Sequence, residues 1–392
     1  IPIVNGELDY SRVCDEVGGF RDIQYKVLRT MREQNFIDDP LRILRLFRFQ
    51  SKLGFDIENL TWRYAVNNAN LLKTVAKERI KKEFDGILKG PYVQMALRNM
   101  LHAGVLEQLF EDVKPMMDFL HCDKHHFHES IIEHTIRVVQ GTPNDRTLRL
   151  AAFFHDFGKP AVFDAQKGNH YIGHEKKGAE MAEKILVETR YEKQTVQDVK
   201  TLIEYHDVSL DSKSKFNEIC FYHGEALFKK LIQLMQADKR ATFADYATFE
   251  QALEAKATKT LGYRDIFQAM REKIRGQLLL EIGMKPNPLF SRIIDYLQKK
   301  FLKKPETFSD EALLKAAGEL LHFKDRYGQL YYKMELYQRI QEVYKDGIIY
   351  GVVEGETQIS FQSQLFEYRY LSLEAFEKMD KKGSYIVFSS VC

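Results

Sequence analysis

Apolar residues recur at three- and four-residue spacing over most of the chain, which is the spacing that places them on one face of an α-helix. Between residues 38 and 112 they follow this period, and Gly54 and Gly90 interrupt it. A second block with the same pattern covers residues 113 to 240 and holds most of the 12 histidines. The pattern predicts a mainly α protein built from several groups of helices.

Three short stretches depart from the helical period. Residues 26–30 alternate and predict the last strand of a sheet whose other strands are absent, although a lone strand cannot be stable by itself. Residues 348–350 and 385–388 are β-like runs. We therefore expect a short β remnant at the N-terminal end and a small α/β extension at the C-terminal end.

The region between the second block and this extension is also predicted to be helical. Pro286 and Pro288 break the chain before a helix at residues 289–301. Thr307 and Asp310 have the spacing of a capping box, which predicts a helix from there to Lys345. A stripe of apolar residues on that helix is more often core than a cofactor site.

Composition limits the class of protein. A chain of 392 residues with 44% hydrophobic and 29% charged residues suits two or three globular domains. No apolar run approaches the roughly 18 to 20 residues that span a bilayer. The four cysteines lie far apart and form no CxxC pair, which disfavours a structural zinc module and indicates a reducing, cytoplasmic location. They are Cys14, Cys122, Cys220 and Cys392.

Charge offers a weaker signal for nucleic-acid binding. The formal net charge is only +2, so any such affinity must come from a local patch. Between Arg21 and Lys114 there are 17 Lys and Arg against 12 Asp and Glu. A solvated helical face and a phosphate-binding surface both explain this excess, and charge alone does not choose between them.

The strongest chemical signal is the pair His155-Asp156, which ends an apolar helix and is followed by Gly158, Lys159 and Pro160. Adjacent residues on a helix point about 100° apart, so both side chains reach one metal ion only near a helix end. The abrupt end of the helix therefore suits a shared metal.

Further nitrogen and oxygen donors occur at other predicted helices or helix edges. A lone histidine on an apolar helix is usually a core residue, but donors in this number and order predict a metal site. Nitrogen and oxygen ligands suit divalent ions such as Mn²⁺, Fe²⁺, Ni²⁺ or Zn²⁺, with Mg²⁺ also considered, and a bound ion activates water. We expect His125, His126 and His128 to form a polar loop beside the site. The further candidates are His134, His174, His206 and Asp238.

The order of these residues resembles the HD superfamily of metal-dependent phosphohydrolases. His134, His155-Asp156 and Asp238 match its ligands, and the resemblance implies an all-α helical bundle. The run from Phe153 to Pro160, followed by the run from Tyr171 to Glu175, looks specifically like the HD domain of bacterial CCA-adding enzymes.

The same resemblance implies roles for individual residues. His174 and His206 resemble the extra ligands of two-metal members. Lys159 matches a lysine that is often placed to meet substrate phosphate. His155, Asp156 and Lys159 are thus the implied catalytic residues.

A second motif lies at residues 36–45. Asp38 and Asp39 are expected in the first turn of a helix, where the dipole favours carboxylates, and Arg42 follows one turn later. These charges need no ligand. The stretch also resembles the nucleotide-recognition helix of class II CCA-adding enzymes and bacterial poly(A) polymerases, whose Glu-Asp-x-x-Arg motif contacts the base edge. Asp39 and Arg42 match it, whereas Asp38 stands where glutamate is usual.

The resemblance continues beyond that helix. Residues 77–83 resemble the second neck helix, residues 94–98 the helix after it, and residues 283–289 part of the tail. It implies nucleotide-binding roles for Asp38, Asp39, Arg42, Arg45 and Arg79.

In all, the resemblance covers about residues 6 to 317 and identifies the chain as a bacterial class II tRNA nucleotidyltransferase without its N-terminal catalytic head. The chain does not begin with methionine, which fits that reading. The implied domains are a head remnant (1–30), the neck with its nucleotide-recognition and RNA-binding helices (31–112), the HD domain (113–242), a helical body or tail (243–346) and a C-terminal extension (347–392).

Three functions remain open. The chain is part of a CCA-adding enzyme, a stand-alone HD phosphohydrolase or phosphodiesterase, or the tRNA-binding subunit of a split nucleotidyltransferase. The first implies tRNA and nucleoside triphosphates as partners, with ATP and CTP as substrates when a head is present. A separate catalytic head or a homodimer is a further expected partner, and nucleotide addition is not expected from this chain alone.

Overall fold

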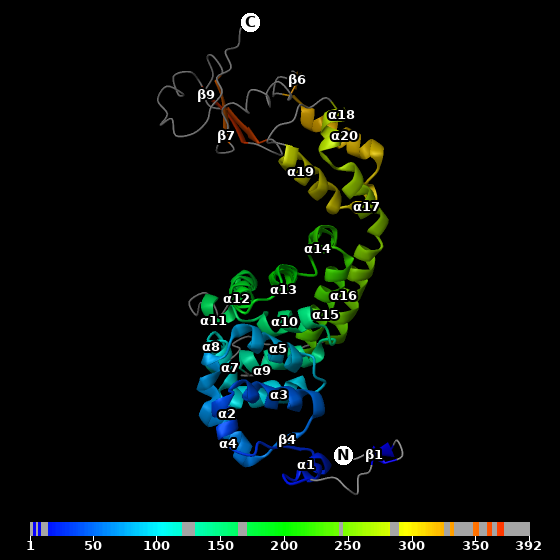
Figure 1. Ribbon diagram of the computed structural model, residues 1–392. Coiled ribbons are helices and arrows are strands. Elements are labelled where there is room, and N and C mark those ends of the chain that lie inside the picture. The colour runs from blue at the N-terminus through cyan, green and yellow to red at the C-terminus, as the bar shows by residue number, and fades with distance from the viewer. Residues whose placement is uncertain are drawn as a thin grey trace. The chain divides into compact units, whose positions relative to one another are not determined.

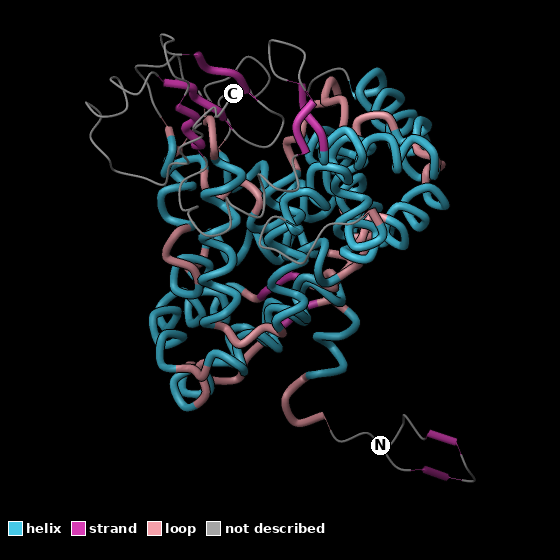
Figure 2. Tube along the Cα trace, turned by 90° about the horizontal axis from the view of Figure 1, so that it is seen from above, coloured by secondary structure: helices cyan, strands magenta, loops and turns pink. Residues whose placement is uncertain are grey.

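The structure is a computed structural model, and most of the elements that it describes are helices (Figures 1 and 2). Its residue contacts form two compact units, Ile1–Asp211 with His223–Ala257, and Ser212–Tyr222 with Thr258–Cys392. The predicted mainly α fold class is confirmed. None of the described helices is long and apolar enough to cross a membrane. The structure describes residues 3–4, 7–8, 15–119, 130–163, 171–242, 246–282, 290–324, 330–332, 348–352, 359–362 and 367–371.

The N-terminal part of the first unit is a group of short helices around α3. Ile43, Leu44 and Phe47 are fully buried on α3, which packs against α5 and α6. Their spacing is the helical period read from the sequence. The elements in order are α1 (Gly19–Gln24), β3 (Val27–Leu28), α2 (Gln34–Asp38), α3 (Leu41–Leu53), β4 (Asp56–Ile57), α4 (Asn59–Asn68), the 3-10 helix η2 (Ala69–Thr74), α5 (Lys77–Leu88), α6 (Val93–His102), α7 (Val105–Leu109) and α8 (Val113–Asp118).

The strand predicted at residues 26–30 has a partner within the chain. It is β3, and it pairs in parallel with β4, Val27 opposite Asp56 and Leu28 opposite Ile57. The expectation that all its partner strands are absent was therefore wrong. Two further strands, β1 (Ile3–Val4) and β2 (Glu7–Leu8), pair with each other in antiparallel fashion.

The single helix predicted from residue 36 is two helices. Helix α2 ends at Asp38, and Asp39 has an extended backbone with φ −141° and ψ 89° before Pro40. The proline ring disfavours the helical conformation of the residue before it, so the chain leaves the helix at Asp39. The prediction that Asp38 and Asp39 occupy a first helical turn was wrong.

The second part of the first unit packs its helices around α10. Helix α9 lies against α15 and α10, and α13 lies against α10 and α12 (Figure 1). Ser130 and Asp145 cap α9 and α10 by accepting backbone N–H groups from Glu133 and Leu148. The elements are α9 (Ile131–Gly141), α10 (Arg146–Phe154), α11 (Lys159–Val162), α12 (His174–Glu188), α13 (Lys193–Tyr205), α15 (Glu225–Ala241) and α16 (Tyr246–Leu261).

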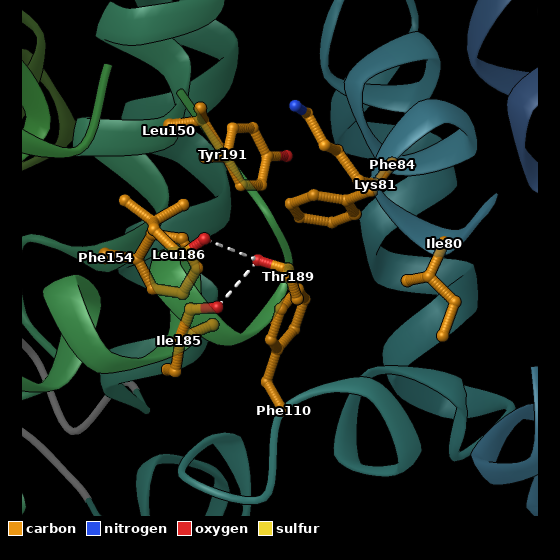
Figure 3. A pocket seen from close by; sticks show the side chains of 10 residues that line it. All are labelled: Ile80, Lys81, Phe84, Phe110, Leu150, Phe154, Ile185, Leu186, Thr189 and Tyr191. Atoms are coloured by element: carbon orange, nitrogen blue, oxygen red, sulfur yellow. Dashed lines mark hydrogen bonds between the residues drawn. The ribbon is translucent and has the colours of Figure 1, made fainter. Parts of the chain in front are cut away.

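The two parts of this unit share a core. Phe84 on α5 and Phe153 on α10 make an edge contact with ring centroids 5.2 Å apart, and Phe110 contacts both rings. A hollow between α5 and α12 is lined by Ile80, Tyr191 and other residues that are mostly apolar (Figure 3). It offers about 10 Å³, which is room for about one water molecule and not for a ligand.

A buried arginine strengthens this junction. Arg149 on α10 is 5% exposed and donates to the carbonyl groups of Leu88 and Gly90, at the C-terminal end of α5, and to that of Thr142. The last carbonyls of a helix have no partner within the helix, and the guanidinium supplies one here. Burial lowers the pKa of Arg149.

The second unit holds most of α14 (Lys215–His223) and the helices α17 (Arg264–Lys273), α18 (Gly276–Glu281), α19 (Phe290–Leu302) and α20 (Asp310–Leu321). The helix predicted to reach Lys345 was too long, because α20 ends at Leu321. The predicted capping box was also wrong: Thr307 ends the 3-10 helix η4 (Pro305–Thr307), and the Ser309 hydroxyl accepts the Ala312 N–H.

Among the described residues, five short strands follow α20. Strand β5 (His322–Lys324) pairs with β6 (Leu330–Tyr332), and β9 (Glu367–Leu371) pairs with β7 (Ile348–Val352) and β8 (Ile359–Gln362). Strand β7 confirms the β-like run at residues 348–350. The run at 385–388, the tail motif at 283–289 and His125, His126 and His128 lie outside the described residues.

Candidate functional site

The six donors predicted as metal ligands come together in the first unit. His134 lies on α9, His155 and Asp156 follow α10, His174 begins α12, His206 follows α13, and Asp238 lies on α15. Four of the six are fully or almost fully buried at the centre of these helices, His174 is 6% exposed, and the side chain of Asp238 is 28% exposed. The fold therefore brings six donors that lie far apart in the sequence into one cluster.

Asp156 lies at the middle of this cluster and faces two groups of histidines. Its Oδ2 atom is 3.2 Å from His155 Nε2 and 3.8 Å from His134 Nε2. Its Oδ1 atom is 3.8 Å from His174 Nε2 and 3.9 Å from His206 Nε2. Two sets of three donors close enough to hold a divalent ion thus share one carboxylate.

Asp238 completes the first of these groups. Its Oδ1 atom lies 2.9 Å from His134 Nε2 and 3.5 Å from His155 Nε2. The four donors of this group therefore converge from α9, α15 and the turn after α10.

Three of the histidines are oriented by backbone carbonyl groups. The Nδ1 atoms of His155, His174 and His206 lie 2.8, 2.9 and 2.7 Å from the carbonyl oxygens of the residues three positions earlier. A carbonyl oxygen only accepts, so each Nδ1 carries the proton and each Nε2 is left to bind an ion when the ring is neutral. Such supporting hydrogen bonds are usual around metal ligands.

The donor set fits a divalent metal ion. Among the described residues, the buried atoms His155 Nε2 and Asp156 Oδ1 have no hydrogen-bond partner, and both face the centre of the cluster. Leaving buried polar atoms unsatisfied is costly unless another group binds them. Imidazole and carboxylate donors together suit the borderline divalent ions, without selecting one of them.

Opposite charges inside the cluster stabilise the charged forms of Asp156 and His155. Burial alone would raise the pKa of Asp156, but His155 and Lys159 outweigh it and hold that pKa well below its usual range. Burial alone would lower the pKa of His155, but Asp156 and Asp238 raise it to about 10. Burial, together with the charges on His155 and His174, lowers the pKa of His206 to about 3. The site therefore keeps Asp156 ionised.

Lys159 lies against the shared carboxylate. Its Nζ atom is 2.8 Å from Asp156 Oδ2, and its side chain is 11% exposed. The predicted contact of Lys159 with substrate phosphate is not tested by this position and stays a prediction.

Glycines let the site form at two positions. Gly173 has φ +87° and precedes His174, a backbone conformation that other residues rarely adopt. Gly158, in the turn after Asp156, packs directly on the first turn of α12, where an added Cβ atom would lie 2.2 Å from the His174 carbonyl oxygen and 2.6 Å from the Gly178 nitrogen. These contacts are with backbone atoms, which cannot move aside without shifting α12.

We expect Gly158→Ala to lower the free energy of unfolding by about 1–3 kcal/mol, the usual cost of overpacking. It should also weaken metal binding, because α12 carries His174. Chemical denaturation and metal titration would measure both effects. Gly141→Ala is the control, since its Cβ atom would meet Ala237 at an ordinary 3.6 Å. Equal stability of the two variants would contradict the close packing described here.

The residues predicted to bind nucleotide only partly converge. Asp39 accepts from Arg79 Nη2 at 3.2 and 3.3 Å, and its Oδ2 atom is 4.0 Å from Arg42 Nε. Asp38 instead accepts from Gln34, and Arg45 lies 3.7 Å from Glu83. Asp39, Arg42 and Arg79 thus form one cluster between α2, α3 and α5, and the side chains of both arginines are about half exposed.

Sequence reasoning missed two residues beside the predicted metal ligands. The Tyr171 carbonyl orients His174, and Asp207, next to His206, is a further carboxyl whose pKa is raised by burial. The position of Asp207 beside a predicted ligand was a usable signal. The backbone carbonyls had none, because any residue type can supply them.

Two family models match the chain in agreement with this geometry. The HD domain model matches residues 130–246, which contain all six donors. A model described as "Probable RNA and SrmB-binding site of polymerase A" matches residues 54–117.

Curated proteins are similar over a larger part of the chain. The CC-adding tRNA nucleotidyltransferase of Thermus thermophilus is 28% identical over 296 residues, which cover 70% of this chain and 65% of that protein. The A-adding tRNA nucleotidyltransferase of Deinococcus radiodurans is 28% identical over 243 residues, 59% of this chain and 56% of that protein. The chain thus spans between a half and two thirds of the length of these relatives.

A solved structure shows the same fold. The CCA-adding enzyme of Bacillus stearothermophilus, in complex with CTP, superimposes with a TM-score of 0.50 at 19% identity. The match covers 74% of this chain and 64% of that one.

Proposed function

We propose that the chain, which is similar to bacterial tRNA nucleotidyltransferases and matches the HD domain model, supplies base recognition, tRNA binding and a phosphohydrolase site to an enzyme that completes tRNA 3′ ends. The phosphohydrolase part of this proposal rests on one observation. Asp156 is shared by two groups of buried histidines within the segment that matches the HD domain model.

In this proposal, His134, His155, Asp156 and Asp238 hold one divalent ion, and Asp156, His174 and His206 hold a second. When bound, such ions offset the negative charge of a phosphoester and make water a nucleophile at neutral pH. The protein holds Asp156 ionised, fixes three imidazole rings through their Nδ1 atoms and buries all the donors except Asp238. Lys159 adds a positive charge where a substrate phosphate would arrive.

Removing the metal tests this directly. The chain treated with a chelator is expected to release no phosphate from phosphoesters, and Mn²⁺, Fe²⁺, Ni²⁺, Zn²⁺ or Mg²⁺ added back one at a time should restore activity to different degrees. Phosphate release is measured together with the metal content of the purified protein. Full activity of protein shown to be free of metal would refute the phosphohydrolase proposal.

We further propose that Asp39, Arg42 and Arg79 form the base-recognition cluster. Asp39 is held by two arginines, so its carboxylate has a defined direction, and the partly exposed guanidinium groups keep donors available to a base edge. Asp38 and Arg45 lie outside this cluster, because Asp38 accepts from Gln34 and Arg45 pairs with Glu83.

Binding of tRNA to the neck should depend strongly on salt. Contacts between Lys or Arg and phosphates release counterions, so affinity falls steeply as salt rises. We expect tRNA affinity to drop by roughly tenfold or more between 50 and 200 mM salt, as filter binding or fluorescence anisotropy would measure. Unchanged affinity over that range would contradict phosphate binding by the basic patch between Arg21 and Lys114.

A further inference from the structure

Helix α5 of the neck contacts a turn that leads to the metal cluster, and the function proposed above gives this contact no role. Residues 189–192 join α12 to α13, and we call them the hairpin turn. Lys81 of α5 donates to the Arg190 carbonyl oxygen and to Glu192 Oε1, both at 3.0 Å. Its Nζ atom also lies 4.8 Å from the centre of the Tyr191 ring, and both side chains line the hollow in Figure 3. One lysine therefore contacts three consecutive residues of the hairpin turn.

Two further observations show that α5 holds the hairpin turn in a defined conformation. The Tyr191 hydroxyl donates to Asp85 Oδ1 at 2.8 Å, so a second side chain of α5 contacts the turn. Arg190 has φ +61°, a left-handed conformation that a residue other than glycine keeps only where its surroundings hold it. The ion pair of Lys81 with Glu192 is partly screened by water, because the Glu192 side chain is 57% exposed. The hold therefore depends on the carbonyl, ring and hydroxyl contacts together.

The hairpin turn lies at the far end of the two helices that present the second donor group. Helix α12 begins at His174, and His206 follows α13. A four-residue connection makes the two helices antiparallel, and the Nε2 atoms of the two histidines are 3.3 Å apart at the other end. The first donor group takes its ligands from α9, from the turn after α10 and from α15. Only the second group therefore depends on the position of the α12–α13 hairpin.

We propose that Lys81 is a positioning residue of the metal cluster, which holds the hairpin turn from α5 and thereby sets His174 and His206 relative to Asp156. This inference rests on the proposed two-ion site. Ligands must be held to within about 0.5 Å of the geometry that binds an ion. Closely packed helices transmit a displacement of one end to the other, so a shift of the turn reaches both imidazole rings.

The position of Lys81 in the sequence gives the inference its wider meaning. Lys81 lies within residues 54–117, which match the RNA-binding model, and outside residues 130–246, which match the HD domain model. The second donor group is thus completed by a residue outside the segment that supplies its ligands.

The competing explanation is that Lys81 only stabilises the fold. A residue of that kind affects the binding of both ions or of neither, whereas a positioning residue of the second group affects one ion. Lys81→Met keeps the length of the side chain and removes the charge, and Lys81→Arg keeps the charge. Lys200→Met is the control, because Lys200 makes an ion pair with Glu183 within the same hairpin.

The experiment titrates the whole chain with Mn²⁺ by calorimetry and counts the bound ions by elemental analysis. His174→Ala identifies the binding step of the second group, since it removes one donor of that group. We expect Lys81→Met to lower the affinity of this step by about tenfold, the loss typical of residues that support a metal ligand. The other step should change by less than twofold. Lys81→Arg should bind both ions, and so should Lys200→Met.

Several results would overturn the positioning role. They are unchanged binding of both ions by Lys81→Met, equal weakening of both steps, and binding of a single ion by the unmodified chain. An equal loss of the second ion in Lys200→Met would assign the effect to the stability of the hairpin and would also overturn it. Urea denaturation of the metal-free variants should show similar free energies of unfolding for Lys81→Met and Lys200→Met.

Metal binding is measured without a phosphoester, so failure of the positioning role and failure of the proposed function can be distinguished. If Lys81→Met loses the second ion but the unmodified chain hydrolyses no phosphoester, the positioning role stands and the phosphohydrolase proposal fails. If the unmodified chain hydrolyses phosphoesters and Lys81→Met binds both ions normally, the phosphohydrolase proposal stands and the positioning role is wrong.

Discussion

Asp156→Ala is expected to lower metal-dependent phosphate release by at least roughly a hundredfold, because residues that merely support a metal ligand already cost 10- to 100-fold when removed. Asp156 faces both donor groups, so its loss should weaken binding at both at once. His174→Ala removes a donor from only one group and should leave part of the bound metal in place. Phosphate release and metal content, measured for both variants, would show this difference.

His102→Ala is the matched control, since His102 is an exposed histidine on α6, outside the metal cluster. Its activity and metal content should equal those of the unmodified chain. Full activity of both Asp156→Ala and His155→Ala would show that the cluster is not the phosphohydrolase site.

Arg149→Leu is expected to lower the free energy of unfolding by about 3 kcal/mol, because it leaves the carbonyls of Leu88, Gly90 and Thr142 without their buried donor. Both parts of the first unit should become less stable, since Arg149 joins α5 to α10. Urea denaturation followed by circular dichroism would measure it.

Arg146→Ala provides the comparison for this prediction. Arg146 is also on α10 and pairs with Glu192 and Asp85, but its side chain is 31% exposed. Exposed pairs contribute about 1 kcal/mol or less. If Arg149→Leu costs no more than Arg146→Ala, the buried guanidinium does not hold the junction together.

The convergence of the six donors could be predicted from the sequence because it depends on residue types, whereas their binding of an ion stays a prediction. Adjacent imidazole and carboxylate groups at a helix end are rare enough to be informative, and His155 and Asp156 do lie in the turn after α10. By contrast, the role of Arg149 could not be predicted. Its partners are backbone carbonyls, which carry no mark in the sequence.

Errors in the predicted fold arose where the local sequence pattern allows more than one structure and pairing with another strand decides between them. Residues 322–324 and 330–332 fit the helical period as well as a strand, and only the pairing of β5 with β6 decides between them. The partner of β3 could not be predicted either, because the paired residues of β4 lie 29 positions further along the chain and only two residues of each strand pair. The break at Pro40 was different, because the effect of proline on Asp39 could have been recognised.

Backbone carbonyl groups three residues earlier hold the rings of His155, His174 and His206 in place. This has a consequence for the free energy of binding a metal ion. A free imidazole side chain loses rotational freedom when an ion captures it, and this loss opposes binding. Here the rings are already immobilised by their own helix ends. Binding of an ion therefore costs little additional side-chain entropy. The Nε2 atoms should point in nearly the same directions in the metal-free and the metal-bound protein.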